Sequence, residues 1–118
     1  MTQEEKDLLL KDLCARLPYG VKVQIIKNLH LGIFTLYPSD IDKLKLGTAD
    51  IKPYLRPMSS MTEEEEEERQ ELWHSSFSPT EYATLFLDFC NERHLDYRGL
   101  IDKGRAIKVT EENNPYKD

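Results

Sequence analysis

The side chains that could bind a metal ion or attack a substrate are few and widely spaced. The histidines are His30, His74 and His94, and no Cys-x-x-Cys or His-x-x-x-His pair accompanies them. Zinc sites need ligands at such short spacings, so we predict no bound metal and no other cofactor. Cys14 and Cys90 lie within helical patterns beside leucine and phenylalanine. This setting predicts two buried thiols rather than nucleophiles or a disulfide.

Motifs of catalysis are missing as well. The sequence has no phosphate-binding glycine loop, no nucleophile elbow and no paired-histidine helix of a zinc protease. Asp40 and Asp42 lack the glycine and the terminal glutamate of a calcium loop. Since no constellation of catalytic groups is visible, we predict that the protein is not an enzyme.

Six consecutive glutamates occupy residues 63–68. Thr62 and Glu65 have the spacing of a capping box, and the dipole of the helix that follows favours negative charge at its start. The run has three interpretations: a solvated helix start, an acidic face that binds a basic partner, or mimicry of a nucleic-acid backbone. Glu66 and Glu67 are the candidate interaction residues of this run.

Tyrosine and arginine occur together at two places. Tyr54 and Arg56 lie in one segment, and Tyr97 and Arg98 lie in another. Both residue types dominate the energetics of protein interfaces, so these four residues are candidates for interaction with a partner. The competing interpretation is internal, with buried tyrosines whose hydroxyls are bonded and arginines paired with the glutamate-rich helix.

The strongest helix is predicted over residues 79–94. Ser78 caps it, Pro79 occupies its first position, and apolar residues then recur at helical spacing. That stripe consists of Tyr82, Leu85, Phe86, Phe89 and Cys90. Residues 2–17 and 63–75 are predicted as further helices, the second of them on the surface because it has little to bury.

Alternating apolar and polar residues predict strands at residues 21–27 and 33–37. Residues 38–47 are predicted as a turn followed by weak alternation. Residues 51–58 are predicted as an edge strand, because its two prolines cannot donate hydrogen bonds to a ladder. Residues 106–109 are predicted as a short last strand.

These elements predict a single α+β domain over residues 1–109 and a flexible C-terminal tail at residues 110–118. The domain would consist of an N-terminal helix, a small antiparallel sheet of three or four strands, and two C-terminal helices packed on one sheet face. No apolar run approaches the ~20 residues that span a bilayer, and the N-terminus lacks the features of a secretory signal. We therefore expect a cytoplasmic protein without a membrane partner, either a monomer or a small homo-oligomer.

The net charge of −6 is unevenly distributed. Residues 21–62 contain six basic and three acidic residues, whereas residues 63–96 contain two basic and eleven acidic residues. The two halves therefore differ in sign, which steers partners or draws the halves together. The overall acidity disfavours nucleic acid as a partner.

Three blocks of sequence occur together: LLLKDLCARLPYGVKV at residues 8–23, DIKPYLRPMSSMTEEE at residues 50–65 and HLDYRGLIDKG at residues 94–104. In these blocks the chain resembles a family of small uncharacterised proteins of gut Bacteroidetes and of their phages and mobile elements. The resemblance covers rather more than a third of the chain. It implies a phage or mobile-element setting and no particular activity.

Two functions are therefore expected. The first is that of a non-enzymatic protein-binding or regulatory protein of a phage or mobile element, whose partner is another protein. The alternative is a nucleic-acid-associated accessory protein with a basic strand face, formed by Lys22, Lys27, Lys43 and Lys45. Retention on heparin or DNA at low salt separates the two, because only the second function requires it.

Overall fold

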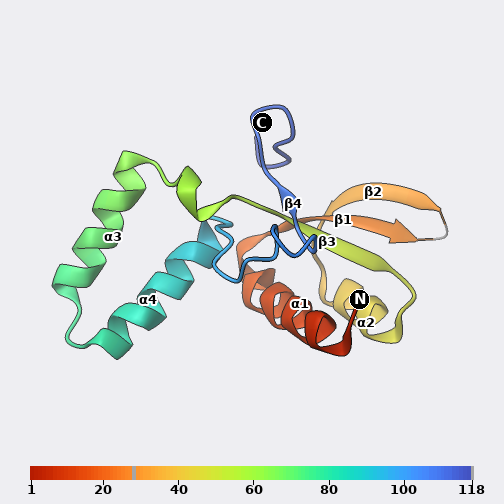
Figure 1. The fold of residues 1–118 in the computed structure, drawn as a ribbon, viewed down its shortest axis with the longest axis horizontal. Helices are drawn as coiled ribbons and strands as arrows, with labels where there is room; N and C mark the ends of the chain where they lie inside the picture. Colours follow the sequence, from red (N-terminus) through yellow and green to blue (C-terminus); the bar gives the residue numbers. More distant parts are fainter. Residues whose placement is uncertain (28, 118) are drawn as a thin grey trace.

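The helices and strands form two groups that lie at opposite ends of the molecule (Figure 1). The computed structural model describes residues 1–27 and 29–117, apart from the side chain of Lys27. The first group is α1 (Gln3–Arg16), β1 (Lys22–Lys27), β2 (His30–Thr35), α2 (Pro38–Leu46) and β3 (Asp50–Leu55). The second group is α3 (Glu63–Ser75) and α4 (Pro79–Glu92), after which the chain returns to the sheet as β4 (Ile107–Lys108). There are 3-10 turns at Leu17–Tyr19 and Met58–Ser60.

The sheet has the strand order β2-β1-β3-β4. β2 and β3 both pair with β1 in antiparallel orientation, and β4 pairs with β3 in parallel orientation. The predicted α+β class is confirmed, with a mixed sheet in place of a purely antiparallel one. β4 can join in parallel because the chain passes through both α3 and α4 before it returns, and a parallel connection needs such a long crossover.

β3 lies inside the sheet, so its predicted edge position is wrong. The N–H of Leu36 donates to the carbonyl of Val21 at 3.0 Å, so the odd-numbered residues of β1 face β2 and the even-numbered ones face β3. Pro53 lies opposite Val23, and its nitrogen therefore faces away from β1. β4 begins only opposite Tyr54. Pro53 therefore lacks an N–H group at a position where no neighbouring strand would accept a hydrogen bond from it.

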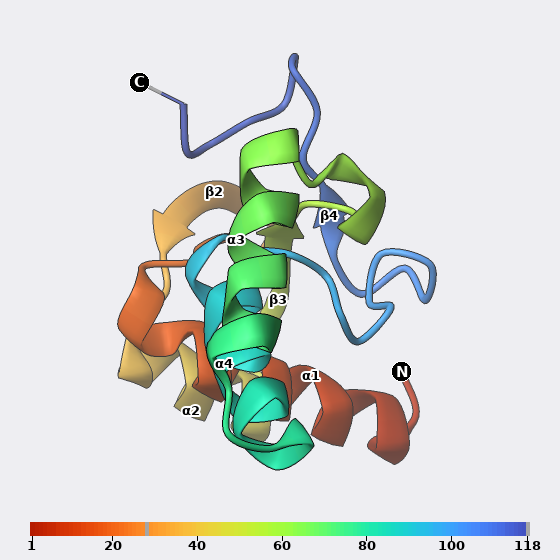
Figure 2. The same cartoon turned by 90° about the vertical axis from the view of Figure 1, so that its left-hand side faces the viewer.

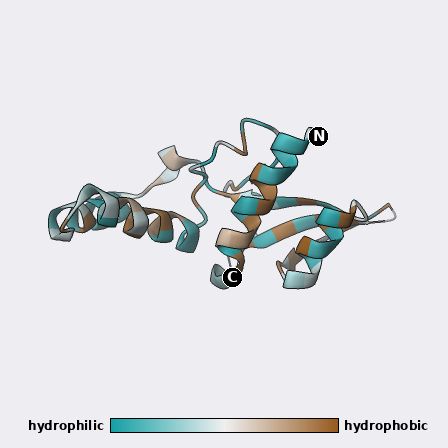
Figure 3. Cartoon of the chain, turned by 90° about the horizontal axis from the view of Figure 1, so that it is seen from below, coloured by the Kyte–Doolittle hydropathy of each residue, from teal (hydrophilic) through white to brown (hydrophobic). Residues whose placement is uncertain are grey.

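α1 and α2 cover one face of the sheet, and Figure 3 shows both helices in front of the strands. Leu9 and Leu13, four residues apart on α1, turn the same helical face toward the sheet. They share a cluster, here the main cluster, with residues of the other elements, including Val23, Leu36, Ile41, Leu44, Ile51 and Leu55. Each such buried side chain contributes roughly 1.5–3 kcal/mol, so this cluster holds the first group of elements together.

α2 occupies a segment that the sequence predicts as a turn. Pro38 stands at its first position, and the carboxylate of Asp40 accepts a hydrogen bond from the N–H of Tyr37 at 2.9 Å. These are signals of a helix start as much as of a turn. Along the helix only Ile41 and Leu44 bury apolar side chains, which is too few for the helical period to stand out in the sequence.

α3 and α4 pack on each other and project away from the sheet, rather than covering the sheet face as predicted (Figures 1 and 2). A second cluster lies where this hairpin joins the rest of the protein. It consists of Phe89, Cys90 and Leu95, flanked by Met58, Met61, Leu72, Phe86 and Tyr97. Trp73 stays half exposed and meets the ring of Tyr82 edge to face.

Cys14 is exposed whereas Cys90 is buried, so the prediction of two buried thiols is wrong for Cys14. α1 turns Leu9 and Leu13 toward the sheet, and Cys14 follows about 100° further around the helix, outside the buried stripe. Burial raises the pKa of the Cys90 thiol to about 11, which keeps it protonated and inert.

The segment after β4 folds back and reaches the sheet through Tyr116. The Tyr116 hydroxyl accepts a hydrogen bond from the N–H of Lys22 at 3.0 Å and donates one to the carbonyl of Tyr54 at 2.7 Å. The register of β1 and β3 ends at the pair Val23 and Pro53, and Lys22 and Tyr54 are the next residues on the two strands. The hydroxyl bridges these two residues in place of the next ladder hydrogen bond. The Tyr116 ring stacks on His94 with centroids 3.9 Å apart. The tail predicted as flexible at residues 110–118 is thus held to the sheet at this residue.

Candidate functional site

β2 forms an open edge of the sheet, and no other strand in the described part of the chain pairs with its outer side. Its sequence, HLGIFT, contains no lysine, no acidic residue and no proline, and no β-bulge interrupts its register with β1. Edge strands of natural proteins usually carry such features, which prevent pairing with other chains. The outer side of β2 therefore has none of these features to prevent another strand from pairing with it.

The backbone of β2 offers every second residue to an incoming strand. Because the odd-numbered residues of β1 face β2, the even-numbered residues of β2 are the ones that bond to β1. Leu31, Ile33 and Thr35 therefore direct their N–H and C=O groups outward. An added strand would form its hydrogen-bond ladder with these three residues.

Apolar side chains surround this edge on both faces. Leu31 and Ile33 lie on the open face of the sheet and are 61% and 51% exposed, and Phe34 lies on the helix side and is 53% exposed. Next to the strand, Leu29 and Tyr37 are 99% and 64% exposed. We call these five residues and the outer backbone of β2 the β2 edge. Apolar surface of this extent on a monomer is often a site where a partner binds.

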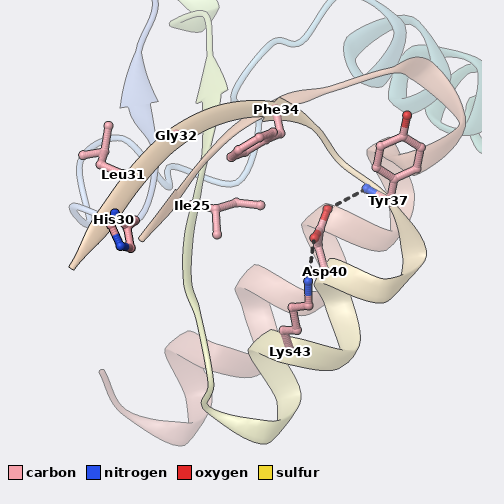
Figure 4. A pocket seen from close by; sticks show the side chains of 8 residues that line it. All are labelled: Ile25, His30, Leu31, Gly32, Phe34, Tyr37, Asp40 and Lys43. Atoms are coloured by element: carbon pink, nitrogen blue, oxygen red, sulfur yellow. Dashed lines mark hydrogen bonds and ion pairs between the residues drawn. The ribbon is translucent and has the colours of Figure 1, made fainter. Parts of the chain in front are cut away.

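A cavity of about 380 Å³ opens beside the β2 edge, between the β1–β2 hairpin and α2 (Figure 4). Its lining consists of Ile25, His30, Leu31, Gly32, Phe34, Tyr37, Asp40 and Lys43. A Cβ atom added at Gly32 would lie 2.3 Å from the ring of Phe34. Because residue 32 has no side chain, the aromatic ring can lie along the strand at the mouth of the cavity.

Asp40 places a buried carboxylate in the cavity wall, and this carboxylate is already engaged. It accepts the hydrogen bond from the N–H of Tyr37 and lies 3.9 Å from the Nζ atom of Lys43. These contacts fix the start of α2 and thereby the wall of the cavity. The apolar part of the wall, formed by Ile25, Leu31 and Phe34, suits an apolar side chain.

Tyr54 and Arg56, two of the predicted interaction residues, are engaged inside the fold. Tyr54 is buried, and Arg56 forms a bidentate ion pair with Glu65 at N–O distances of 2.6 and 2.9 Å. The Nε atom of Arg93 lies 3.6 Å from the same carboxylate, which also accepts the N–H of Thr62 and so caps α3. The hydrogen bonds from Arg56 lower the pKa of Glu65 to about 2, against the effect of burial. This clamp joins α3 to the end of β3 and to α4.

Tyr97 and Arg98 belong to a second internal group that contacts α1. The guanidinium groups of Arg16 and Arg98 both lie over the ring of Tyr97, 5.1 and 4.7 Å from its centroid. Arg16 is fully buried and donates to Asp12 at 2.8 Å and to the carbonyl of Leu95 at 2.6 Å. Arg98 lies 3.6 Å from Asp12. These contacts favour the internal interpretation of the tyrosine–arginine pairs.

The remaining candidates lie along α3. Glu66 pairs with Arg69 of the same helix, Glu68 pairs with Arg93, and Glu67 is exposed without contributing to either pair. The structure therefore does not bring the six predicted interaction residues to one surface. The β2 edge was not among the predicted residues, although an apolar strand without charge or proline was a signal for it.

The lysines of the alternative function are divided between the two faces of the sheet. Lys22 bonds through its Nζ atom to the hydroxyl of Thr35 at 2.6 Å on the open face, whereas Lys43 and Lys45 belong to α2 on the covered face. The side chain of Lys27 lies outside the described residues. The three described lysines thus do not form a single basic surface.

Comparison of the chain with protein-family models, curated proteins and solved structures finds no match. Within residues 1–27 and 29–117, no group of three or more histidine, cysteine, aspartate or glutamate residues could hold a metal ion. In the same part of the chain, no helix is long and apolar enough to cross a bilayer. The β2 edge and its cavity are the features on which we base a proposed function.

Proposed function

We propose that this is a non-enzymatic protein-binding or regulatory protein that binds its partner by strand addition at the β2 edge. The observation that carries the proposal is an uncharged, proline-free edge strand beside an apolar cavity. In this mode of recognition the backbone ladder supplies affinity, and pockets for alternate side chains supply selectivity. The phage or mobile-element setting implied by the sequence resemblance is part of the same proposal.

The geometry favours a partner strand with apolar side chains. Those that point to the helix side would meet Phe34 and the cavity, and those on the open face would meet Leu31 and Ile33. A charged side chain beside Leu31 and Ile33 would lose water without gaining an opposite charge, and in the cavity the charges of Asp40 and Lys43 already face each other. The partner strand is therefore expected to be uncharged where it lies along β2.

The test is capture of a partner from the native host during phage growth, with two variants run in parallel. Ile33→Lys puts a charge on the β2 edge at a half-exposed position, and Phe77→Lys makes an equivalent change at the 95% exposed tip of the α3–α4 hairpin. The proposal expects a partner that the wild type and Phe77→Lys capture and that Ile33→Lys loses. Unchanged capture by Ile33→Lys would reject strand addition at β2, and retention on heparin at low salt would favour the nucleic-acid alternative.

A further inference from the structure

We infer that the strand accepted by the β2 edge is β2 of a second copy of this chain, which produces a two-fold symmetric dimer with a continuous sheet. The inference rests on the proposed strand addition and names its partner. An axis at Ile33 would place Ile33 opposite its own counterpart and Leu31 opposite Thr35 of the other copy. Their outward backbone groups would then form an antiparallel ladder.

The side chains of β2 complement one another in this register. On the open face the isoleucines meet at the axis, and no charged group of the strand is desolvated. On the helix side Gly32 lies opposite Phe34 of the other copy. Because the ring of each Phe34 covers Gly32 of its own chain, the two rings would lie side by side across the axis. Beyond the strand the same register aligns Leu29 with Tyr37, the two most exposed apolar residues of the β2 edge. Every exposed apolar residue of this edge therefore faces an uncharged counterpart.

The distribution of charge allows this contact and opposes association through the other end of the molecule. The α3–α4 hairpin, residues 63–92, contains one basic and ten acidic residues, a net charge of −9. It projects from the end opposite β2, and the longest dimension of the molecule is 49 Å (Figure 1). Pairing through β2 keeps the two acidic hairpins apart by many times the ~8 Å over which charges interact at physiological salt.

The exposed area is sufficient for a weak dimer. The five apolar side chains of the β2 edge expose roughly 600 Å² in each copy. Complete burial of this surface in both copies would remove about 1,200 Å² from water, at the lower end of the range for specific protein interfaces. We therefore expect a dimer that dissociates reversibly on dilution.

Sedimentation velocity over a series of protein concentrations tests the dimer. The wild type and Phe77→Lys should convert from monomer to dimer as concentration rises. Ile33→Lys and Ile33→Glu should each stay monomeric, because like charges would then face each other across the axis. An equimolar mixture of these two variants should form the dimer again, several-fold tighter than either variant alone, because a lysine then faces a glutamate across the axis. This rescue requires residue 33 to lie on the two-fold axis, where it meets residue 33 of the other copy. Failure of the mixture to associate would overturn the proposed register.

Amide hydrogen exchange gives a second, site-resolved readout. The amides of Leu31, Ile33 and Thr35 should become more protected as concentration rises, whereas those of Gly32 and Phe34 should be protected throughout because they bond to β1.

A protein that stays monomeric, with the amides of Leu31, Ile33 and Thr35 unprotected at every concentration, would overturn the second copy as the occupant. Strand addition would still stand if Ile33→Lys lost a different host partner. A dimer that persists unchanged in Ile33→Lys would exclude β2 as the interface between copies.

Discussion

The hydroxyl of Tyr116 donates a hydrogen bond of 2.7 Å to the carbonyl of Tyr54, a residue 62 positions earlier in the chain. The same oxygen accepts from the backbone of Lys22, so one side chain closes the gap where β1 and β3 separate. Burial raises the pKa of Tyr116, which keeps the hydroxyl protonated and able to donate. The integrity of the sheet therefore depends on a residue close to the C-terminal end of the chain.

Removing this hydroxyl should destabilise the protein. Tyr116→Phe keeps the ring that stacks on His94 but leaves a backbone N–H and a backbone C=O without their partner. We expect a loss of about 1–3 kcal/mol in the free energy of unfolding, measured by urea titration at neutral pH. Tyr19→Phe, at an exposed tyrosine, is the matched control and should change stability little. Equal stability of the two variants would mean that the hydroxyl bridge contributes nothing.

His94 should make stability depend on pH. It is half-buried with a φ of 61°, and within the described part of the chain its Nδ1 atom has no hydrogen-bond partner. Burial, with smaller effects of Arg16 and Arg56, lowers the pKa of His94 from 6.5 to about 4. Between these values the unfolded chain binds a proton that the folded chain does not, so stability falls as pH falls from 6.5 to 4.

The expected loss over this window is on the order of 1–3 kcal/mol, complete once both states are protonated. His94→Asn should flatten the dependence, because asparagine tolerates the left-handed backbone and does not titrate. His74→Asn, at an exposed histidine, should leave the dependence as it is. The measurement is the free energy of unfolding at several pH values above 4.5. An unchanged slope in His94→Asn would assign the titration to another group.

Glu65 should be the one member of the glutamate run that matters for stability. Glu65→Gln breaks the bidentate pair with Arg56 in a mostly buried setting and should cost about 2–4 kcal/mol. Because the folded pKa of Glu65 is about 2 and its ordinary value is 4.5, its contribution is present above pH 4.5 and is lost as pH falls toward 2. Denaturant titration of the variant should therefore show a weaker pH dependence in that window.

The neighbouring glutamates provide the control for this experiment. Replacing Glu66, Glu67 and Glu68 together by glutamine removes two half-exposed ion pairs and relieves repulsion within the run. Such pairs are worth ~0–1 kcal/mol, so the triple variant should change stability by less than about 1 kcal/mol. A triple variant as unstable as Glu65→Gln would mean that the whole run, and not one residue, clamps the hairpin.

The two cysteines should differ sharply in reactivity. In the native protein an aromatic disulfide reagent should modify Cys14 rapidly and Cys90 slower by on the order of 100-fold, because Cys90 is buried with a raised pKa. In denaturant both thiols should react at similar rates. Cys14→Ser should abolish the fast phase. Two fast thiols in the native protein would place Cys90 at the surface.

Much of the fold could be predicted because its signals are local. Three helices begin with a capping side chain that accepts the backbone N–H three residues later, namely Thr2, Thr62 and Ser78. Their residue types and the glutamate or proline that follows them are recognisable in the sequence as signals of a helix start. α2 lacked such a clear signal, since only two of its apolar residues are buried. The interior position of β3 depends on where β4 begins relative to Pro53, which is a contact between segments far apart in sequence.

The candidate site was harder to predict for the same reason. A strand such as β2 has the same alternation whether or not another strand covers its outer side, and only the strand order shows that the side is open. The partners of Arg56 and Arg98 were foreseeable as acidic residues, but their identity as Glu65 and Asp12 depends on how the hairpin and α1 pack. The residue types alone therefore indicated that these arginines have acidic partners, whereas the open edge of β2 is evident only from the strand order.

The separation of charge along the molecule has a consequence for how it orients. With a net charge of −9 on the α3–α4 hairpin and −6 in total, the rest of the chain has a net charge of +3, and the two parts lie along a 49 Å axis. The monomer therefore has a large electric dipole moment. A positively charged surface would attract it hairpin first and leave β2 facing the solution. In a two-fold pair the dipole components perpendicular to the axis cancel, so association through β2 would abolish that preferred orientation.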